Sequence, residues 1–361
     1  MSGQNTRTWR RFVGMDVHRE TIAICVLDEG GVECRVKRTI ASRRQALREW
    51  LAAYMDPAVP TRFALEALSP ARWVVAELRA AGFDVVLVHP FGVRLIVQSK
   101  KKSDRVDARA LADLLRLGRL PAAYIATPEE QALRALVRHR ESLRAEMTSK
   151  KNRIHAILHC NDEHFEGSDV FGKRGRAWLA ARAFPEDERF VVDQLLAGID
   201  ALERQIAEAD ERIAARVEDD PFVALLRTIP GVGPAIAPAL RAEAGDVRRF
   251  ERPEQFAAYT GLVPATWESG GSRTGGGITK KGNHVLRWAL VYAALHVCRW
   301  SAEWKTRYTR LRRRIKKHKA RVAMARRLAV AIWHMAKTGE VFRYRERPPK
   351  EPKKPKKPKA A

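Results

Sequence analysis

The order of apolar runs in the first third of the chain limits its fold more than any other feature. Apolar runs at 12–17, 21–27 and 32–40 follow one another closely, which predicts three strands joined by tight turns. The patterns that follow predict helices over 43–54, 70–81, 91–98 and 104–117 and strands over 62–67 and 84–88. Three strands followed by βα units predict an α/β domain over residues 12–120, with a mixed sheet and helices on its faces.

Four acidic residues stand at informative places in this pattern. Asp16 and Glu66 each end an apolar strand, and Asp104 and Asp107 lie three residues apart at the start of a helix. Acids at strand ends and on one helix face can converge on one point. Convergent carboxylates in a basic chain predict a divalent cation, and hard oxygen ligands favour Mg²⁺ or Mn²⁺. A helix-dipole role for Asp104 and Asp107 is the alternative, and the nearby His18 is interpreted as a bystander.

The chain is strongly basic. Its 361 residues hold 68 Lys and Arg against 42 Asp and Glu, which gives a formal net charge of +26 and predicts a polyanionic partner, most simply nucleic acid. Four scattered cysteines without a Cys-x-x-Cys pair disfavour a zinc site and indicate a reducing, cytoplasmic location near the nucleoid. The longest apolar stretch, 285–298, is too short to span a bilayer, so no membrane association is expected.

Two later runs have a heptad-like spacing. Apolar residues recur at intervals of three and four over 133–157 and again over 195–217. This spacing predicts two long helices that pair antiparallel in a spacer over residues 128–220. A dimerising coiled coil and an ordinary helical hairpin within one chain both remain open.

Residues 221–342 predict a third, mainly helical domain with a glycine-rich centre. Two helical stretches in it are joined by Ile229-Pro230-Gly231-Val232-Gly233. Gly231 and Gly233 would let backbone N–H groups approach a phosphate, as in the hairpin of helix-hairpin-helix DNA-binding elements. A tight turn without a ligand is the alternative.

The glycine-rich centre of this domain carries two serines, Ser269 and Ser272. Such a loop can move and can bring a hydroxyl close to a bulky substrate. Three basic residues could bind the flanking phosphates: Arg273, Lys280 and Lys281. No histidine lies close in sequence to act as a base, so a metal ion would have to activate the serine. By itself, the composition favours a phosphate-binding loop without a nucleophile.

Basic residues also gather in three other places. Lys100, Lys101, Lys102 and Arg105 flank the acids of the predicted metal site, where they could hold a phosphate backbone. Residues 299–327 carry thirteen Lys and Arg and one acid, with aromatic residues between them; this suits duplex or structured RNA, although the aromatics fit a core equally well. The lysine- and proline-rich segment 343–361 predicts a disordered basic tail that attracts phosphate or aids solubility.

In this order and spacing, the motifs resemble DEDD-type insertion-sequence transposases, a family of bridge-RNA-guided recombinases related to Piv-type DNA invertases. The resemblance covers nearly all of residues 12–340. The first half resembles the family's RuvC-like, RNase H-fold domain through Gly14-Met15-Asp16-Val17-His18, Ala64-Leu65-Glu66 and Lys102-Ser103-Asp104-Arg105-Val106-Asp107-Ala108. The second half resembles its transposase domain through Ile229–Gly233, Tyr259-Thr260-Gly261-Leu262-Val263-Pro264, Glu268-Ser269-Gly270-Gly271, Ile278-Thr279-Lys280-Lys281-Gly282-Asn283 and Leu286-Arg287.

The resemblance implies roles for these residues. The four acids would hold divalent metals, and a serine would attack DNA to form a transient phosphoserine. The family's serine precedes glycine, so it maps best onto Ser269, with Ser272 as the second choice. Arg287 would belong to the nucleic-acid-binding residues. The resemblance also implies a homo-oligomer, a dimer or a tetramer, in which the serine of one subunit reaches the acids of another. A structured non-coding RNA would choose target and donor DNA by base pairing.

The sequence therefore predicts a metal-dependent, serine-using DNA recombinase that moves its own insertion element. Its partners would be double-stranded DNA at the element ends and the target, and the guide RNA. Two rival functions remain. One is a RuvC-like nuclease that hydrolyses Holliday junctions with water, and the other is a non-catalytic nucleic-acid-binding protein.

Overall fold

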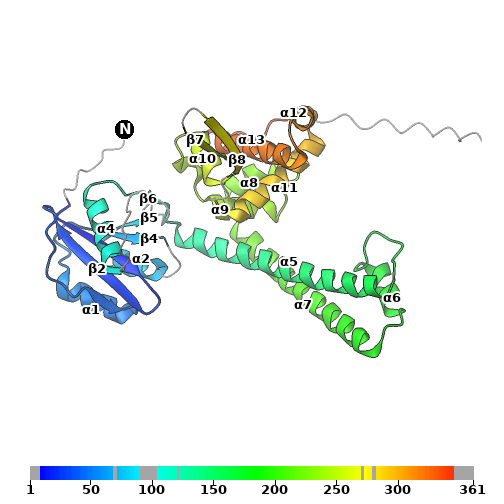
Figure 1. Ribbon diagram of the computed structural model, residues 1–361, viewed down its shortest axis with the longest axis horizontal. Coiled ribbons are helices and arrows are strands. Elements are labelled where there is room, and N and C mark those ends of the chain that lie inside the picture. Colours follow the sequence, from blue (N-terminus) through cyan, green and yellow to red (C-terminus); the bar gives the residue numbers. More distant parts are fainter. Residues whose placement is uncertain are drawn as a thin grey trace, which may run out of the picture. The chain divides into compact units, whose positions relative to one another are not determined.

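The computed structural model (Figure 1) describes residues 9–67, 71–88, 104–120, 122–269, 272–278 and 282–344, except the side chains of residue 122 and of residues 264–277. The chain divides into two compact units, 1–125 and 126–361. The finer division of the second unit into a spacer and a C-terminal domain stays a prediction, as does the basic tail, which lies outside the described residues.

A mixed sheet forms the first unit. Its strands are β1 (Arg11–Val17), β2 (Thr21–Asp28), β3 (Thr39–Ala41), β4 (Thr61–Glu66), β5 (Asp84–Val88) and β6 (Ala122–Ala123), in the order β3-β2-β1-β4-β5-β6. Strands β1, β4 and β5 are parallel, and the other pairings are antiparallel. Three described helices accompany the sheet: α1 (Arg44–Tyr54), α2 (Ala71–Ala80) and α4 (Asp104–Arg116). This mixed α/β arrangement is compatible with the expected RNase H-like fold.

Two details of this unit differ from the sequence prediction. The third strand is much shorter than the predicted 32–40, because the segment before Thr39 bonds to β2 only at intervals. The contacts are the Leu27–Glu33 bridge and the backbone hydrogen bonds from Asp28 N to Val32 O, from Cys34 N to Val26 O and from Ile24 N to Arg38 O. The short strand β6 was not predicted at all. The helix predicted over 91–98 lies outside the described residues.

Strand β1 separates two different layers. Val13, Met15 and Val17 are buried in the core that contains residues of α1 and α2. Because side chains alternate along a strand, Gly14 and Asp16 face the opposite side, where α4 packs. Beside Gly14 the contacts include the small residues Ala23, Cys25, Ala108 and Ala112, whereas larger residues of α4, Leu111, Leu114 and Leu115, pack with Phe12 and Val88.

Gly14 allows α4 to lie unusually close to the sheet. A Cβ atom at Gly14 would stand 1.9 Å from the carbonyl oxygen of Ala108 and 2.6 Å from the backbone nitrogen of Ala112. No side chain fits in this gap, so α4 can lie this close to the sheet only because position 14 is glycine. The start of α4, with Asp104 and Asp107, is thereby held near the end of β1 that carries Asp16.

We therefore expect Gly14→Ala to push α4 away from the sheet. Overpacking of this kind costs about 1–3 kcal/mol, and the shift would also separate Asp16 from Asp104. Thermal unfolding should show the loss of stability, and the predicted stabilisation by added Mg²⁺ should shrink with it. Gly30→Ala is the matched control, because a Cβ atom there meets only the Asp28 side chain at 3.4 Å. Equal behaviour of the two variants would contradict the role given to Gly14.

Two long helices begin the second unit and pair antiparallel (Figure 1). They are α5 (Pro128–Cys160) and α7 (Glu186–Arg216), with α6 (Lys173–Ala180) in the connection between them. Buried residues match along the pair: Leu133 and Val137 share a core with Ile213 and Val217, Leu143 with Leu202 and Ile206, and Ile154 and Leu158 with Leu195 and Ile199. The predicted pairing is thus made within one chain, and dimerisation through it stays a prediction.

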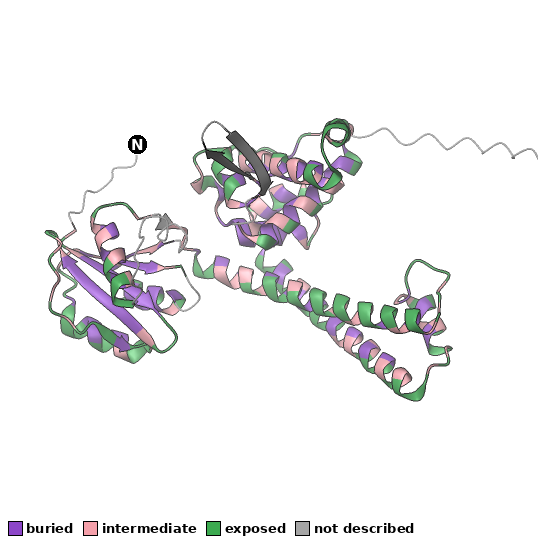
Figure 2. Cartoon of the chain, in the orientation of Figure 1, coloured by how far each residue is buried: buried purple, intermediate pink, exposed green. Residues whose placement is uncertain are grey.

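The rest of the second unit is mainly helical. Its elements are α8 (Pro221–Arg227), α9 (Ile236–Ala244), a 3₁₀ turn (Val247–Arg249), α10 (Pro253–Tyr259), β7 (Pro264–Ser269), β8 (Ser272–Ile278), α11 (His284–Trp300), α12 (Ala302–Arg314) and α13 (Lys317–Thr338). Buried faces of α8, α9, α11 and α13 form one core (Figure 2), which also takes in the neighbouring ends of α5 and α7. Among the described residues, no helix combines the length and apolar character needed to cross a membrane.

Candidate functional site

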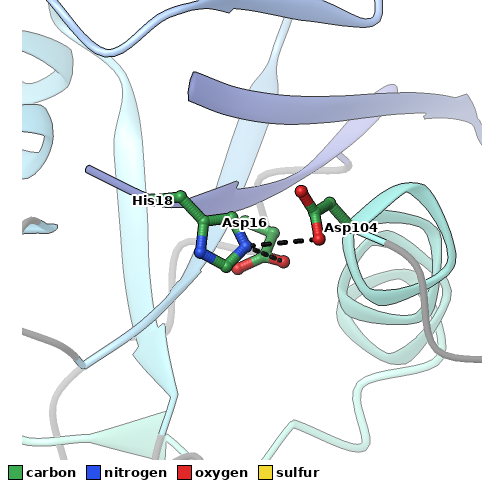
Figure 3. Close-up of side chains that lie close together, drawn as sticks. All are labelled: Asp16, His18 and Asp104. Carbon is green, nitrogen blue, oxygen red and sulfur yellow. Dashed lines mark hydrogen bonds and ion pairs between the residues drawn. The ribbon is translucent and has the colours of Figure 1, made fainter. Parts of the chain in front are cut away.

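Asp16, His18 and Asp104 converge at the end of β1 (Figure 3). The His18 Nε2 atom lies 3.0 Å from Asp16 Oδ2, at hydrogen-bond distance, and 3.5 Å from Asp104 Oδ1. One potential ligand atom from each residue lies within 4.8 Å of the other two. Asp16 is buried, whereas His18 and Asp104 are exposed. This cluster therefore joins a strand end to the first turn of α4 and opens to solvent on one side.

The other two predicted acids come from the same ends of the same elements. The parallel register pairs Met15 with Leu65, so Glu66 follows on β4 where Asp16 follows on β1. Asp107 lies one turn after Asp104 in α4, close enough for its charge to affect Asp16. Neither Glu66 nor Asp107 belongs to the closest group of ligand atoms. Their role as metal ligands stays a prediction.

The surroundings of Asp16 disfavour its negative charge. Burial raises the pKa of Asp16 above its ordinary value, and the charges of Asp107 and Asp104 raise the pKa further, while His18 lowers it. A carboxylate held in this way gains stability from any nearby positive charge. The pKa shift therefore indicates a site that suits a cation.

His18, interpreted from the sequence as a bystander, lies within the cluster. It lies two positions after Asp16, and residues i and i+2 of an extended segment face the same side. This alternation could have placed His18 beside Asp16. The basic residues predicted around the site are only partly visible: Arg105 is exposed in α4, whereas Lys100, Lys101 and Lys102 lie outside the described residues.

The two candidate serines flank the turn of a β-hairpin. Ser269 ends β7 and Ser272 begins β8, and the two residues pair in the antiparallel register. The sequence predicted a glycine-rich loop here, and that prediction is wrong for the flanking segments, because Thr266, Trp267 and Ile278 are strand-favouring residues that pair despite the glycines. Arg273 lies in β8, whereas Lys280 and Lys281 lie outside the described residues.

The two ends of this hairpin segment meet at a pair of glycines. Gly261 has a positive φ of 70°, and a Cβ atom at Gly282 would lie 2.4 Å from both the Gly261 nitrogen and the Tyr259 carbonyl oxygen. Arg287 donates a hydrogen bond from its guanidinium to the Gly282 carbonyl oxygen at 3.4 Å. The base of the hairpin is therefore closely packed, and Arg287, predicted to bind nucleic acid, contacts it.

A buried carboxylate lies beside this base. Glu243 in α9 is fully buried and receives two hydrogen bonds from Arg138 of α5, with Nε–Oε1 at 2.7 Å and the second nitrogen at 3.0 Å from Oε2. Arg134 adds an ion pair at 3.6 Å. Asn283 donates its amide N–H to Glu243 and caps α11 by accepting from Val285 N and Leu286 N. This network ties α5 and α9 to the point where the chain leaves the hairpin.

The predicted glycine hairpin joins α8 to α9. Ile229 and Val232 are buried and anchor the turn. Gly231 has a φ of 82°, and a Cβ atom there would lie 2.2 Å from the His296 Cβ of α11. Gly233 has open space around it. The turn thus leaves free space beside Gly233, and phosphate binding by this element stays a prediction.

Comparison with known proteins places this chain among transposases. A family model described as transposase, of the DEDD type of IS110, matches residues 13–160, and one described as transposase IS116/IS110/IS902 family matches residues 223–309.

Several relatives match most of the chain. A probable family 20 transposase of Pseudomonas aeruginosa is 28% identical over 80% of this chain and 85% of its own length. The transposase for insertion sequence element IS1328 of Yersinia enterocolitica is 28% identical over 83% and 91%, and that for IS1111A of Coxiella burnetii is 26% identical over 92% and 91%. The chain belongs to the IS116/IS110/IS902 family of insertion-sequence transposases, enzymes that cleave and transfer DNA strands.

Proposed function

We propose that this transposase cleaves and rejoins the DNA of its own insertion element through a serine nucleophile, assisted by a divalent cation at the Asp16 site. The observation that carries the proposal is the convergence of Asp16, His18 and Asp104 within 4.8 Å. The serine would be Ser269, at the turn of the β7–β8 hairpin.

The residues around Asp16 fit a cation of the Mg²⁺ or Mn²⁺ type. Neighbouring ligands of an octahedral ion at about 2.1 Å lie roughly 3 Å apart, and the His18 nitrogen lies 3.0 Å and 3.5 Å from the two carboxylate oxygens. Asp16, His18 and Asp104 would hold the ion, with Glu66 and Asp107 as further ligands. When bound, it supplies charge neutralisation at a phosphodiester.

The serine chemistry is an exchange of ester bonds. The Ser269 hydroxyl oxygen would attack the phosphorus of the DNA backbone, and the bond from phosphorus to one deoxyribose oxygen would break. That oxygen leaves as a hydroxyl, which takes up the proton that serine loses. A hydroxyl of another strand then attacks the phosphoserine and restores the free serine. No oxidant, reductant or nucleotide is consumed.

The partners of this transposase would be DNA and a structured RNA. Double-stranded DNA would be held by Lys100, Lys101, Lys102, Arg105, Arg273, Lys280, Lys281 and Arg287 and by the backbone at Gly231 and Gly233, where the α8–α9 turn would act as a helix-hairpin-helix element. A structured non-coding RNA encoded beside the gene would select the sites. The formal net charge of +26 supports polyanionic partners in general. The chain would act as a homo-oligomer, so that a serine and an acidic site from different subunits form one active centre.

Trapping the covalent intermediate tests the proposal. The protein would be incubated with Mg²⁺, the flanking RNA and labelled element-end DNA, and the products separated on a denaturing gel. We expect a protein–DNA adduct that disappears in Ser269→Ala and in Asp104→Asn. Ser272→Ala is the matched control, because it removes the hydroxyl on the other side of the same turn, and it should keep the adduct.

Other results would change the assignment. Cut DNA without any adduct would indicate a metal-dependent nuclease that uses water. An adduct that survives Ser269→Ala but not Ser272→Ala would move the nucleophile to Ser272. An adduct of equal yield with a scrambled RNA would rule out RNA guidance.

A further inference from the structure

A groove between α12 and α13 is lined with arginines. It has a volume of about 980 Å³, and its basic residues are Arg307, Arg310 and Arg314 of α12 and Arg327 of α13. A second groove of about 860 Å³ continues along α13 and shares Arg307 and Arg327. We call the first of these the α12–α13 groove.

The amphipathic pattern of α12 accounts for this lining. Trp304, Tyr308 and Leu311 recur at intervals of three and four and pack against the helical core, so one face of α12 is turned inward. Arg307, Arg310 and Arg314 share another face at i, i+3 and i+7. With a rise of 1.5 Å per residue, the first and last of these lie about 10.5 Å apart along the helix axis.

Most of the positive charge in the groove has no carboxylate partner. Arg307 pairs with Glu303 at 2.6 Å. Within the described part of the chain, Arg310, Arg314 and Arg327 form no ion pair with an acidic side chain. Like charges held together repel one another, which lowers stability unless an anion binds. The groove is therefore complementary to a ligand with several negative charges.

Three of the four groove arginines lie beyond the part of the chain that the family models match. Those matches end at residue 309, before Arg310, Arg314 and Arg327. The matched family models therefore do not include Arg310, Arg314 and Arg327.

We propose that the α12–α13 groove binds the phosphate backbone of double-stranded DNA. Guanidinium groups match phosphate oxygens with paired hydrogen bonds, and 10.5 Å corresponds to about three nucleotide steps of one strand at 3.4 Å each. The lining of the groove contains no aromatic residue. It therefore offers charge without a surface for stacking, which favours a duplex backbone over unpaired bases. The proposal rests on the action of transposases on DNA and not on the serine chemistry.

Salt dependence of binding tests this proposal directly. Affinity for an unrelated 30-base-pair DNA duplex would be measured in EDTA, where no cleavage complicates the result, over a series of salt concentrations. For the triple variant Arg310→Gln, Arg314→Gln, Arg327→Gln, we expect roughly tenfold weaker binding at 0.1 M salt. The slope of log affinity against log salt should fall in magnitude by about 2–3, since each phosphate contact contributes about 0.9.

Two further variants separate groove binding from other effects. Arg204→Gln, Arg212→Gln, Arg216→Gln removes the same charge from exposed positions of α7 and should keep a slope close to that of the wild type. Replacement of the three groove arginines by lysine should restore most of the slope. An equal change in both glutamine variants, or no change in either, would overturn the proposal. A loss of binding to duplex RNA but not to duplex DNA would assign the groove to RNA instead.

Discussion

Replacement of Asp16 by asparagine is expected to slow DNA strand cleavage by about a thousandfold. Asp16 is the buried member of the cluster with His18 and Asp104. The two carboxylates of this cluster are Asp16 on β1 and Asp104 on α4, and Asp16→Asn removes one of these two negative charges. A bound cation contributes several kcal/mol of charge stabilisation in phosphoryl chemistry, and each 1.36 kcal/mol changes the rate tenfold. Single-turnover cleavage of labelled element-end DNA in Mg²⁺ would measure the loss.

The same substitution should make the metal-free protein more stable. Burial and the charges of Asp107 and Asp104 raise the pKa of Asp16, so the folded protein binds a proton there more tightly than the unfolded chain does. Stability from this group is therefore full below the ordinary pKa of 3.8 and is lost as pH rises through the higher folded value. Asparagine carries no charge and avoids that loss at neutral pH.

Thermal unfolding in EDTA provides the measurement. Asp16→Asn should melt above the wild type at pH 7, and the difference should shrink as the pH falls toward 4. Added Mg²⁺ should raise the melting temperature of the wild type but not of the variant, since only a protein that binds the ion gains from it. Asp113→Asn is the control: it removes an acid from the same α4, where Asp113 pairs with Arg109 and Arg116 at 3.7 Å. Stabilisation of Asp16→Asn by Mg²⁺ would contradict the metal site.

The sheet and its acids were predictable because they depend on local patterns. Apolar runs located β1, β2, β4 and β5 to within one or two residues. The positions of Asp16 at a strand end and of Asp104 at a helix start predicted that the two side chains converge, and in the structure both lie beside His18. The same rules failed where few apolar residues carry the signal. The polar segment before Thr39 gave only a short strand, and the helix Lys173–Ala180 has no clear period in the sequence.

Contacts between distant segments could not be predicted from the sequence alone. A glycine at position 14 is compatible with any strand, and only the packing of α4 on β1 shows that Ala108 leaves no room there for a side chain. Glu243 likewise cannot be told from other helical acids by sequence, because its partner Arg138 lies 105 residues earlier. Such contacts follow from the three-dimensional packing of α5 on α9, which sequence spacing does not determine.

Glu243→Ala is expected to lower the stability of the second unit by about 3 kcal/mol. The substitution leaves Arg138 and Arg134 without their carboxylate and the Asn283 amide without its acceptor. Loss of one partner from a buried ion pair costs about 3–5 kcal/mol, and the lower end applies because the Arg138 side chain is 53% exposed. In a domain of this size, the melting temperature should fall by roughly 6–12 °C.

Two comparisons distinguish this network from ordinary surface charge. Arg248→Ala breaks the exposed pair with Asp246 at 3.0 Å and should cost less than about 1 kcal/mol. Glu243→Gln keeps the shape of the side chain and one acceptor oxygen, so the loss of stability in this variant measures the contribution of the negative charge. Hydrogen exchange should also quicken at residues 285–287 in Glu243→Ala, because Asn283 caps α11 while it is held by Glu243. If Glu243→Ala had the melting temperature of Arg248→Ala and unchanged hydrogen exchange, α5 would not stabilise the base of the β7–β8 hairpin through Glu243.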